Sequence, residues 1–497
     1  MLQSFEELIK SQSQLDGEFL IEPETGNTLQ YSSIDKQTEL IAEKLISAGL
    51  KKGDRVALAV RSGIDACLSV LAILRSGGVL VPVNLGLKEA EFRYILEDSQ
   101  ASFLITTNEI ISECRVDLPK LNAEHICNIG GASLYRLSPE RRDEVREDTA
   151  LILYTSGTTG KPKGVMLTQK NLLAEVSYIS AGHGLTREDT AMLILPLFHI
   201  NGLVIGFLTP FFVGAKLILP RKFSAGAFWE TVRRYNVKWV SAVPTIISMI
   251  MARTSDDSQG RGALRFMRSA SAPLPAAVLR EFEERFETPI IESFGISEGA
   301  SQITTNPTDG MRKAGSAGKP VGNELMVVDE NGAPLPYGQT GEIVVKGENV
   351  FFGYFNKPEE TAAALKDGWF HTGDIGYRDE DGYYFLKGRT KELINRAGEK
   401  FSPREIDEIL YRINGVELAA AVGVPDPLYN EEVVAYIKQH DGADLTEQQV
   451  IDFFKGKIAD FKIPKKVFFV DDLPKGPSGK IQRLKLIDVY LSNNSNS

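Results

Sequence analysis

The stretch Leu151–Thr168, LILYTSGTTGKPKGVMLT, most constrains the fold, because two apolar strand-like runs enclose a loop of small, hydroxyl and lysine residues. Glycines let backbone N–H groups approach phosphate oxygens, hydroxyls donate further hydrogen bonds, and lysines supply positive charge. The loop therefore predicts a polyphosphate site. It is not a Walker A loop, which has four residues between its glycines and continues from Gly-Lys-Ser/Thr into a helix. Here two residues separate Gly157 from Gly160, and Pro162 follows Lys161.

A solvated surface loop is the alternative interpretation of such a Gly/Ser/Thr cluster. The buried-type runs LILY and GVML on either side argue against it.

The length of 497 residues exceeds what one hydrophobic core supports and predicts two or more domains. A net charge of -10 argues against a nucleic-acid partner, so an anionic substrate must be met by local positive charge.

Cysteine usage and the N-terminal sequence both predict a cytoplasmic protein. Cys67, Cys114 and Cys127 are too few and too scattered for a disulfide framework or a zinc site. The first residues, MLQSFEELIKSQ, include early acidic residues and lack the apolar core of a signal peptide. The window Ala191–Ala215 carries no charge and is long enough to cross a bilayer, but prolines, a histidine and glycines interrupt it. We interpret it as a core helix or pocket wall, and we expect no transmembrane segment.

Hydrophobic patterning predicts an α/β protein with a large N-terminal and a smaller C-terminal domain. Strand-like and helix-like segments alternate over residues 1–150 and again after the loop, which indicates two α/β subdomains with mostly parallel sheets. From about Gly318, short runs around the turns DENG and DEDG predict hairpins and a small antiparallel β-barrel. The last hundred residues mix helical and strand patterns and predict an α+β domain. The predicted domains are 1–390 and 391–497, and only the tail SNNSNS has the composition of a disordered end.

The motif TSGTTGKPKGV resembles the signature of the adenylate-forming acid ligases, the superfamily of acyl-CoA synthetases, luciferases and peptide-synthetase adenylation domains. The resemblance implies that this loop binds the phosphates of ATP. The residues that it assigns to this contact are Thr155, Ser156, Gly157, Thr158, Thr159, Gly160 and Lys163.

A second motif, ESFGISE at 292–298, resembles the adenine and magnesium motif of the same family. The resemblance implies that Phe294 stacks on adenine, Ser297 meets the α-phosphate, and Glu298 ligates Mg²⁺. Phenylalanine replaces the commoner tyrosine, which preserves stacking because only the ring face is required. The preceding SASAP segment, with Ser271, would form the opposite wall of the purine slot. Glu292 and Ser293 complete the predicted nucleotide contacts of this motif.

Two later motifs complete the family pattern in the family's order. In HTGDIG, Asp374 can accept hydrogen bonds from both ribose hydroxyls, which suits an ionised carboxylate. By resemblance, Arg389 is the ribose-side arginine and Lys391 is the hinge of a mobile C-terminal domain. Lys480, in PKGPSGKIQR, resembles the mobile lysine that bridges the attacking carboxylate and the α-phosphate.

The remaining predicted site residues concern the acid and coenzyme A. His199, in PLFHIN, matches a gating residue of the family, and Asn201 matches one wall of the acid pocket, although a satisfied core histidine is the alternative. Lys222 and Gly398 match positions that meet CoA in related ligases. Asn395 and Ala397 stand where 4-coumarate ligases carry lysines, so the phosphate contacts of the second step are expected to differ.

The resemblance covers essentially the whole chain and implies an ATP-dependent acid–CoA ligase that uses ATP, Mg²⁺, a carboxylic acid and CoA. The acid joins AMP with release of pyrophosphate, and the acyl group then passes to the thiol with release of AMP. The segments PLFHINGL, FSAGAFWE and KELINRAGEKFSP resemble the oxalate–CoA and 4-coumarate–CoA ligase branch, but Ser301 replaces a histidine of oxalate ligases. Two alternatives stay open: an enzyme that loads the phosphopantetheine of a carrier protein, and a non-catalytic nucleotide sensor. The choice between oxalate, an aromatic acid and a fatty acid stays open, as does a homodimer.

Overall fold

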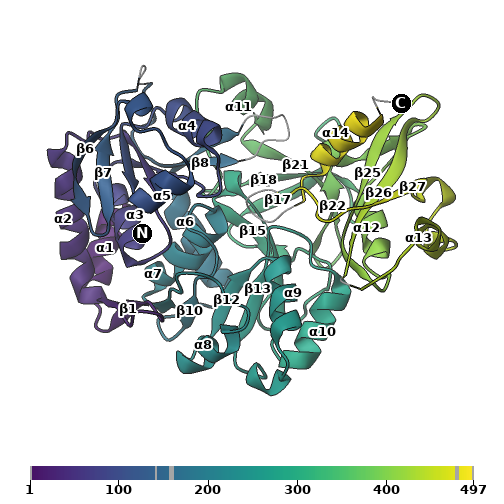
Figure 1. Cartoon of the computed structure of the whole chain (residues 1–497), viewed down its shortest axis with the longest axis horizontal. Helices are drawn as coiled ribbons and strands as arrows, with labels where there is room; N and C mark the ends of the chain where they lie inside the picture. Colours follow the sequence, from purple (N-terminus) through teal and green to yellow (C-terminus); the bar gives the residue numbers. More distant parts are fainter. Residues whose placement is uncertain (1–2, 140–142, 156–161, 441, 476–480, 495–497) are drawn as a thin grey trace.

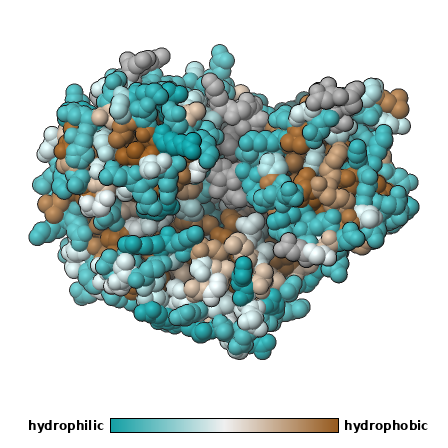
Figure 2. All heavy atoms as spheres, viewed as in Figure 1, coloured by the Kyte–Doolittle hydropathy of each residue, from teal (hydrophilic) through white to brown (hydrophobic). Residues whose placement is uncertain are grey.

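The computed structural model describes residues 3–139, 143–155, 162–440, 442–475 and 481–494 and contains four β-sheets. Figure 1 shows a large N-terminal part, built on three of the sheets, and a smaller C-terminal part that contains β25, β26 and β27. The outline in Figure 2 is notched between these two parts, and most of the visible surface is hydrophilic. The predicted α/β fold with a smaller C-terminal unit is confirmed.

The first sheet has eight strands in the order β19-β9-β8-β4-β3-β5-β7-β6. Its centre is parallel and buried, as the apolar runs VALAV and GVLVPV predict. The strands are β3 (Arg55–Ala59), β4 (Val79–Pro82), β5 (Phe103–Thr106), β6 (Glu124–Ile129), β7 (Ala132–Arg136), β8 (Thr149–Thr155), β9 (Lys163–Thr168) and β19 (Gly353–Tyr354). The helices of this part of the chain are α1 (Phe5–Gln12), α2 (Ile34–Ser47), α3 (Ile64–Arg75), α4 (Glu89–Asp98), α5 (Asn108–Glu113) and α6 (Gln169–His183).

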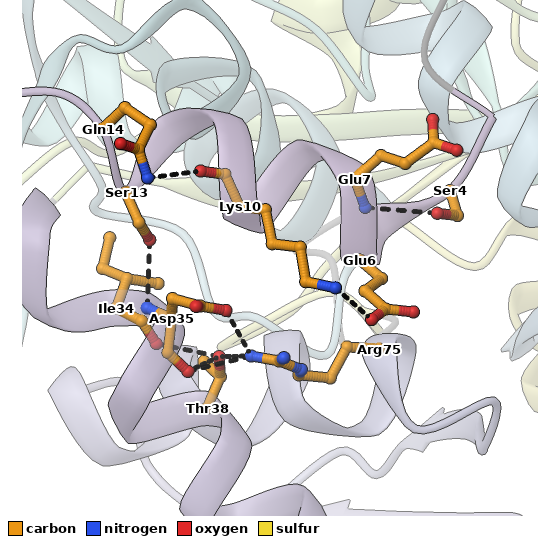
Figure 3. A network of polar contacts seen from close by, with 10 residues as sticks. All are labelled: Ser4, Glu6, Glu7, Lys10, Ser13, Gln14, Ile34, Asp35, Thr38 and Arg75. Atoms are coloured by element: carbon orange, nitrogen blue, oxygen red, sulfur yellow. Dashed lines mark hydrogen bonds and ion pairs between the residues drawn. The ribbon is translucent and has the colours of Figure 1, made fainter.

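A polar network fixes the first three helices against one another (Figure 3). Arg75 Nη1 at the end of α3 donates to the Asp35 carbonyl at 2.8 Å, to Asp35 Oδ1 at 3.0 Å and to Thr38 Oγ1 at 2.8 Å. The Asp35 N–H donates in turn to Ser13 Oγ at the end of α1. The positive charge of Arg75 is favourable at the C-terminus of α3. Its hydrogen bonds to Asp35 and Thr38 hold α2 against α3.

The second sheet has nine strands in the order β16-β15-β14-β13-β12-β10-β11-β1-β2. Strand β14 (Ile290–Ile296) changes its pairing along its length: Ile290–Glu292 pair in parallel with β13, and Ser293–Ile296 pair in antiparallel with β15. The other strands are β1 (Glu18–Ile21), β2 (Thr28–Gln30), β10 (Thr190–Met192), β11 (Lys216–Ile218), β12 (Trp239–Ala242), β13 (Phe266–Ser269), β15 (Ser301–Thr305) and β16 (Lys319–Pro320). Helices α8 (Phe228–Arg234), α9 (Pro244–Arg253) and α10 (Ala276–Phe286) pack against it.

The uncharged window Ala191–Ala215 forms part of this core. It contains the end of β10, a buried π-helix (Asn201–Leu208) and the short helix α7 (Thr209–Val213). Among the described residues, no helix has both the length and the apolar character needed to cross a bilayer.

The region predicted to form a small antiparallel barrel contains a five-stranded antiparallel sheet. The DEDG turn joins two of its strands as a hairpin, as expected. Its strands are β17 (Glu324–Val328), β18 (Gly341–Lys346), β20 (Leu365–Lys366), β21 (Trp369–Arg378) and β22 (Tyr384–Arg389), with α11 (Pro358–Ala364) between β19 and β20.

The fourth sheet forms the centre of the C-terminal part, where the long strands β25 (Val416–Asp426) and β26 (Asn430–Gln439) pair in antiparallel. It also contains β23 (Ile394–Arg396), β24 (Glu399–Phe401) and β27 (Lys466–Phe469), with the helices α12 (Arg404–Leu410), α13 (Glu447–Phe454) and α14 (Arg483–Asn494). Leu486 on α14 is buried against Val422 and Tyr436, so this helix belongs to the core. The tail prediction is therefore wrong at its start, because α14 continues to Asn494.

Candidate active site

The two ends of the predicted phosphate loop lie side by side. Thr155, the last residue of β8, pairs with Lys163, the first residue of β9. The loop between them is therefore the connection of an antiparallel pair. Ser156, Gly157, Thr158, Thr159 and Gly160 lie outside the described residues, so their predicted phosphate contacts stay predictions.

Glu298 lies next to the residues that flank this loop. It follows β14 in a short 3-10 turn, and its Oε1 accepts a hydrogen bond from the hydroxyl of Tyr354 at 2.8 Å. Tyr354 belongs to β19, which pairs with β9, and the Lys163 ammonium lies 5.2 Å from the centre of its ring. Burial, together with the nearby Glu298 charge, raises the pKa of Tyr354, so its hydroxyl remains a donor at neutral pH.

Asp374 and Arg389 form an ion pair, and the charge of Glu298 also acts on Arg389. They are opposite each other on β21 and β22, with Arg389 Nε 3.1 Å from Asp374 Oδ1. Asp374 is buried, and its charge is the main cause that raises the pKa of Arg389, with a further contribution from Glu298. Four segments far apart in the sequence thus meet in one group, which we call the Glu298 cluster: Lys163, Glu298, Tyr354, Asp374 and Arg389.

The predicted purine slot lies where β13 and β14 end. Ser271, two residues after the end of β13, has a left-handed backbone with φ of +73°. Phe294 is 8% exposed and packs into the main hydrophobic core, which holds its ring in a fixed orientation. The following Gly295 is required by a close approach, because a Cβ there would lie 1.8 Å from the Ser301 carbonyl oxygen.

Two predicted nucleotide residues of the same strand already have protein partners. Glu292 Oε2 accepts a hydrogen bond from the Gly315 N–H at 2.9 Å, and burial raises the pKa of Glu292 to about 7. The Ser293 hydroxyl lies 2.8 Å from the hydroxyl of Thr305 on β15. The Ser293 contact ties the strand to its antiparallel neighbour, and the Glu292 contact ties it to the segment before β16, so the two residues also have a structural role.

His199 lies two residues before the start of the π-helix, and its carbonyl oxygen accepts a hydrogen bond from the N–H of Leu203 in the first turn of that helix. Its ring packs against Phe198 at 4.6 Å between ring centres. Asn201 begins the π-helix, is 6% exposed, and accepts a hydrogen bond at Oδ1 from Ser241 on β12. π-helical turns often occur at functional sites, which favours a pocket wall at this position.

The structure shows a buried polar network that the sequence analysis did not find. Gln302 Oε1 lies 2.9 Å from His183 Nε2 and accepts from Arg268 Nε at 3.2 Å. The Gln302 N–H donates to Glu175 Oε1, whose other oxygen accepts from Asn349 at 2.8 Å. All five side chains are buried. The only signal in the sequence is a charged residue inside the apolar run FMRSA, at Arg268.

We expect Glu175→Gln to remove a pH dependence from the free energy of unfolding. Burial raises the pKa of Glu175 from 4.5 to about 8, so between these values the folded protein holds a proton that the unfolded chain has released. The free energy of unfolding of the wild type therefore falls as pH rises from about 4.5 to about 8. Urea denaturation of both proteins at pH 5, 6.5 and 8 tests this, because their difference should change with pH. A constant difference would contradict the raised pKa.

The residues predicted to act with the C-terminal part are more dispersed. Lys391 is exposed in a 3-10 turn (Thr390–Glu392) between β22 and β23. Gly398 is exposed in the β23–β24 turn with φ of +93°, and no heavy atom lies within 4 Å of its missing Cβ. Lys222 is exposed after β11, and within the described part of the chain no hydrogen bond or ion pair joins it to the Glu298 cluster. Lys480 lies outside the described residues.

A close contact joins the two parts of the chain beside Lys391. The Ser402 hydroxyl donates a hydrogen bond to the carbonyl oxygen of Lys387, the third residue from the end of β22. A Cβ on Gly388 would lie 2.8 Å from Ser402 Oγ. Glycine at 388 therefore permits the C-terminal part to pack against β22 in this arrangement.

Comparisons with known proteins agree with this architecture. Residues 10–355 match the AMP-binding enzyme family, and residues 405–480 match the AMP-binding enzyme C-terminal domain. A sulfoacetate–CoA ligase of Cupriavidus necator is 39% identical over 95% of both chains, and an oxalate–CoA ligase of Arabidopsis thaliana is 40% identical over 92% of both. ATP-bound MatB from Rhodopseudomonas palustris superimposes with a TM-score of 0.89 at 31% identity, over 98% of this chain and 99% of that one.

The fold and the two family matches define an adenylate-forming enzyme with a large N-terminal and a small C-terminal unit. The chain belongs to the AMP-binding enzyme family. The prediction of an ATP-dependent acid–CoA ligase that acts through an acyl-adenylate is confirmed at the level of activity, with ATP and CoA as substrates. The apo form of the same MatB superimposes with a lower TM-score of 0.77, so the arrangement described here is closer to the ATP-bound one.

Proposed function

We propose that this acid–CoA ligase activates a short carboxylic acid and that the Glu298 cluster binds its nucleotide. The observation that carries the proposal is the convergence of Lys163, Glu298 and Tyr354 with the Asp374–Arg389 pair. The similarity to ligases of sulfoacetate and oxalate supports a short acid, since both of these molecules are small.

In the first step, a carboxylate oxygen attacks the α-phosphorus of ATP, and the bond from that phosphorus to the bridging oxygen breaks. Pyrophosphate leaves with the electron pair, and an acyl-adenylate forms. Two anions must approach each other, so positive charge at the junction lowers the barrier. We assign this charge to Lys480 and to Lys163 at the end of the phosphate loop. Asp374 accepts hydrogen bonds from the ribose hydroxyls, and Arg389 holds that carboxylate in place.

In the second step, the thiol sulfur of CoA attacks the acyl carbon, the bond to the AMP phosphate oxygen breaks, and the thiol proton passes to solvent. We propose His199 as the side chain that gates this approach, because it lies between Phe198 and the first turn of the π-helix. Gly398 and Lys222 are the proposed contacts of CoA. The positive φ of Gly398 and the open space at its missing Cβ would allow the backbone of this turn to lie against the pantetheine arm.

The residues present fit a magnesium ion that is held mainly by the substrate. Mg²⁺ is usually bound by one or two carboxylates together with substrate phosphates. Among the described residues, no group of three histidine, cysteine or acidic side chains could hold a metal alone, and Glu298 offers a single carboxylate beside the phosphate loop. When bound, the ion would neutralise charge on the phosphates. Tyr354 orients the Glu298 carboxylate through its hydroxyl.

We expect Glu298→Gln to raise the Mg²⁺ concentration needed for half-maximal adenylate formation by about tenfold, which corresponds to ~1.4 kcal/mol. Mg²⁺ prefers charged oxygen ligands, and the substitution preserves shape while removing the charge. Pyrophosphate release measured over a range of Mg²⁺ concentrations tests this. Glu348→Gln is the matched control, because Glu348 is an exposed acid paired with Lys170. An unchanged Mg²⁺ dependence in Glu298→Gln would reject the assignment.

We further propose that the chain divides at residue 391 into a nucleotide-binding domain and a mobile C-terminal domain. All strands of the fourth sheet begin at or after Ile394, which supports this boundary. We expect the enzyme to work in the cytoplasm, where ATP and CoA are available. A homodimer is a further hypothesis, which light scattering during gel filtration would test.

One experiment tests the proposed function. The enzyme is supplied with Mg·ATP and a panel of short, aromatic and fatty acids, and pyrophosphate release is followed for each acid. We expect release with a short acid and a thioester when free CoA is added. A phosphopantetheinylated carrier protein in place of CoA tests the alternative acceptor. No pyrophosphate with any acid would overturn the function, and transfer to the carrier alone would overturn the choice of CoA.

A further inference from the structure

Arg268 is a buried cation without a direct anionic partner. Its side chain on β13 is 1% exposed, and its hydrogen-bond partners are the neutral groups Gln302 Oε1 and Ser241 Oγ, each at 3.2 Å. Among the described residues, no carboxylate lies within ion-pair distance of its guanidinium. Removing a charge from water without an opposite charge in contact is costly, so such an arginine calls for an anion.

Glu175 is the nearest acid, and its oxygens are already engaged. One accepts from the backbone N–H of Gln302 and the other from the Asn349 amide. Glu175 therefore acts on Arg268 only at a distance, and burial lowers the pKa of Arg268 to about 9 in spite of it. Arg268 and Glu175 therefore do not form an internal ion pair, and a structural role of that kind does not explain why the arginine is buried.

Two further polar groups beside Arg268 are buried and have no hydrogen-bond partner among the described residues: Asn201 Nδ2 and Gln302 Nε2. Their residues are 6% and 2% exposed. Each of these atoms can donate a hydrogen bond, so together with the guanidinium they form a set of donors. A buried donor without an acceptor destabilises the folded protein, and an acceptor ligand would remove that cost.

The position of this group relates it to the acid rather than to the nucleotide. Ser241 and Arg268 are register partners near the carboxyl ends of the parallel strands β12 and β13, where open α/β sheets bind ligands. Arg268 is followed within three residues by Ser271 of the predicted purine slot. Asn201, which accepts from Ser241, begins the π-helix two residues after His199.

We propose that Arg268, with Asn201 and Ser241, binds a second anionic group on the acid substrate, a carboxylate or a sulfonate at the end opposite to the activated carboxylate. The inference rests on the proposed function and narrows its substrate to short acids with two negative charges. The second charge replaces the missing partner of the guanidinium. An acid with an apolar end of the same size leaves the guanidinium and its neighbouring donors unpaired, which is a strong basis for rejection.

The first test compares acids of matched shape on the wild-type enzyme. Malonate is paired with 3-methylbutanoate, and sulfoacetate with 3,3-dimethylbutanoate, in which methyl groups replace the oxygens of the second anion. We expect kcat/KM for pyrophosphate release to be roughly 100-fold higher for at least one dianionic member than for its apolar partner. The two pairs also distinguish a carboxylate from a sulfonate. Equal or higher kcat/KM with both apolar acids would overturn the inference while leaving the ligase function intact.

The second test uses Arg268→Met, Arg268→Lys and a matched control. We expect Arg268→Met to lower kcat/KM for the preferred dianionic acid by roughly 100-fold, with kcat/KM for its apolar partner unchanged or raised. Arg268→Lys should recover part of the loss because it restores the charge. Arg55→Met is the control, since Arg55 is 3% exposed in the first sheet and donates to Ser99 and Gln100.

A purely structural role for Arg268 predicts a different outcome, in which Arg268→Met lowers kcat/KM for both acids of a pair equally, as Arg55→Met would. That outcome would overturn the inference. Should Arg268→Met fail to fold, Ser241→Ala and Arg268→Lys decide, because each should reduce the ratio of the two kcat/KM values. Absence of pyrophosphate with every acid would instead reject the proposed function itself.

Discussion

Lys480→Ala should lower the rate of acyl-adenylate formation by about 10² to 10³ and leave thioester formation from preformed acyl-AMP unchanged. Its positive charge is required where the carboxylate approaches the triphosphate, and removal of one such stabilising group costs roughly 3 to 4 kcal/mol of barrier. The second step begins from an adenylate that has already lost pyrophosphate, so the same charge is not needed there. Pyrophosphate release measures the first step, and acyl-CoA yield from synthetic acyl-AMP measures the second.

Lys475→Ala is the matched control for this experiment. Lys475 belongs to the same segment, but its ammonium pairs with Asp472 at 2.6 Å. Its removal should change neither half-reaction. Equal losses in both steps of Lys480→Ala would show that the lysine supports folding or general binding instead of the first transition state.

Lys391→Pro should retain acyl-AMP formation and lose most acyl-CoA formation. Lys480 and Gly398 both follow the predicted hinge, and one small domain is not expected to present both to one active site at once. Lys391 lies in a 3-10 turn, and the φ range of such turns includes the value that proline imposes, so we expect proline to favour the arrangement described here. Because this arrangement is closer to ATP-bound than to apo MatB, proline should hold the enzyme in the state of the first step.

Lys391→Ala separates the loss of φ freedom from the loss of charge, because alanine removes the ammonium and keeps the backbone free. We expect Lys391→Ala to carry out both steps. Pyrophosphate release and thioester yield are measured on the same preparation of each variant. Parallel losses in both steps of Lys391→Pro, or no loss in either, would end the hinge proposal.

The sequence predicts local features of this enzyme well. The alternation of apolar runs with amphipathic segments indicates the two α/β subdomains, and β8 and β9 flank the loop as expected. The motif residues Glu298, Asp374 and Arg389 are recognisable because each belongs to a short motif that resembles one of the family, and these motifs come in the family's order. The structure brings these patterns together, and their individual roles remain predictions.

Contacts between distant segments could not be predicted. Tyr354 meets Glu298 because β19 pairs with β9, and nothing in the sequence near either residue indicates that pairing. Arg268 is a single arginine in an apolar run, and its lack of a counter-ion is visible only once Ser241 and Gln302 are placed beside it. The helix α14 was missed because its buried positions are few and its end is polar.

The divided pairing of β14 has a consequence for how such an enzyme diversifies. Its first half, Ile290–Glu292, belongs to the parallel strands that include Arg268, whereas its second half leads through Phe294 into Glu298. Under the proposed assignment of Arg268, substitutions on β12 and β13 alter the acid that is accepted and leave the backbone pairing of β14 with β15 in place. We expect lineages of this family to exchange acids by few changes on one side of this boundary, and directed evolution libraries to be most productive when confined to that side.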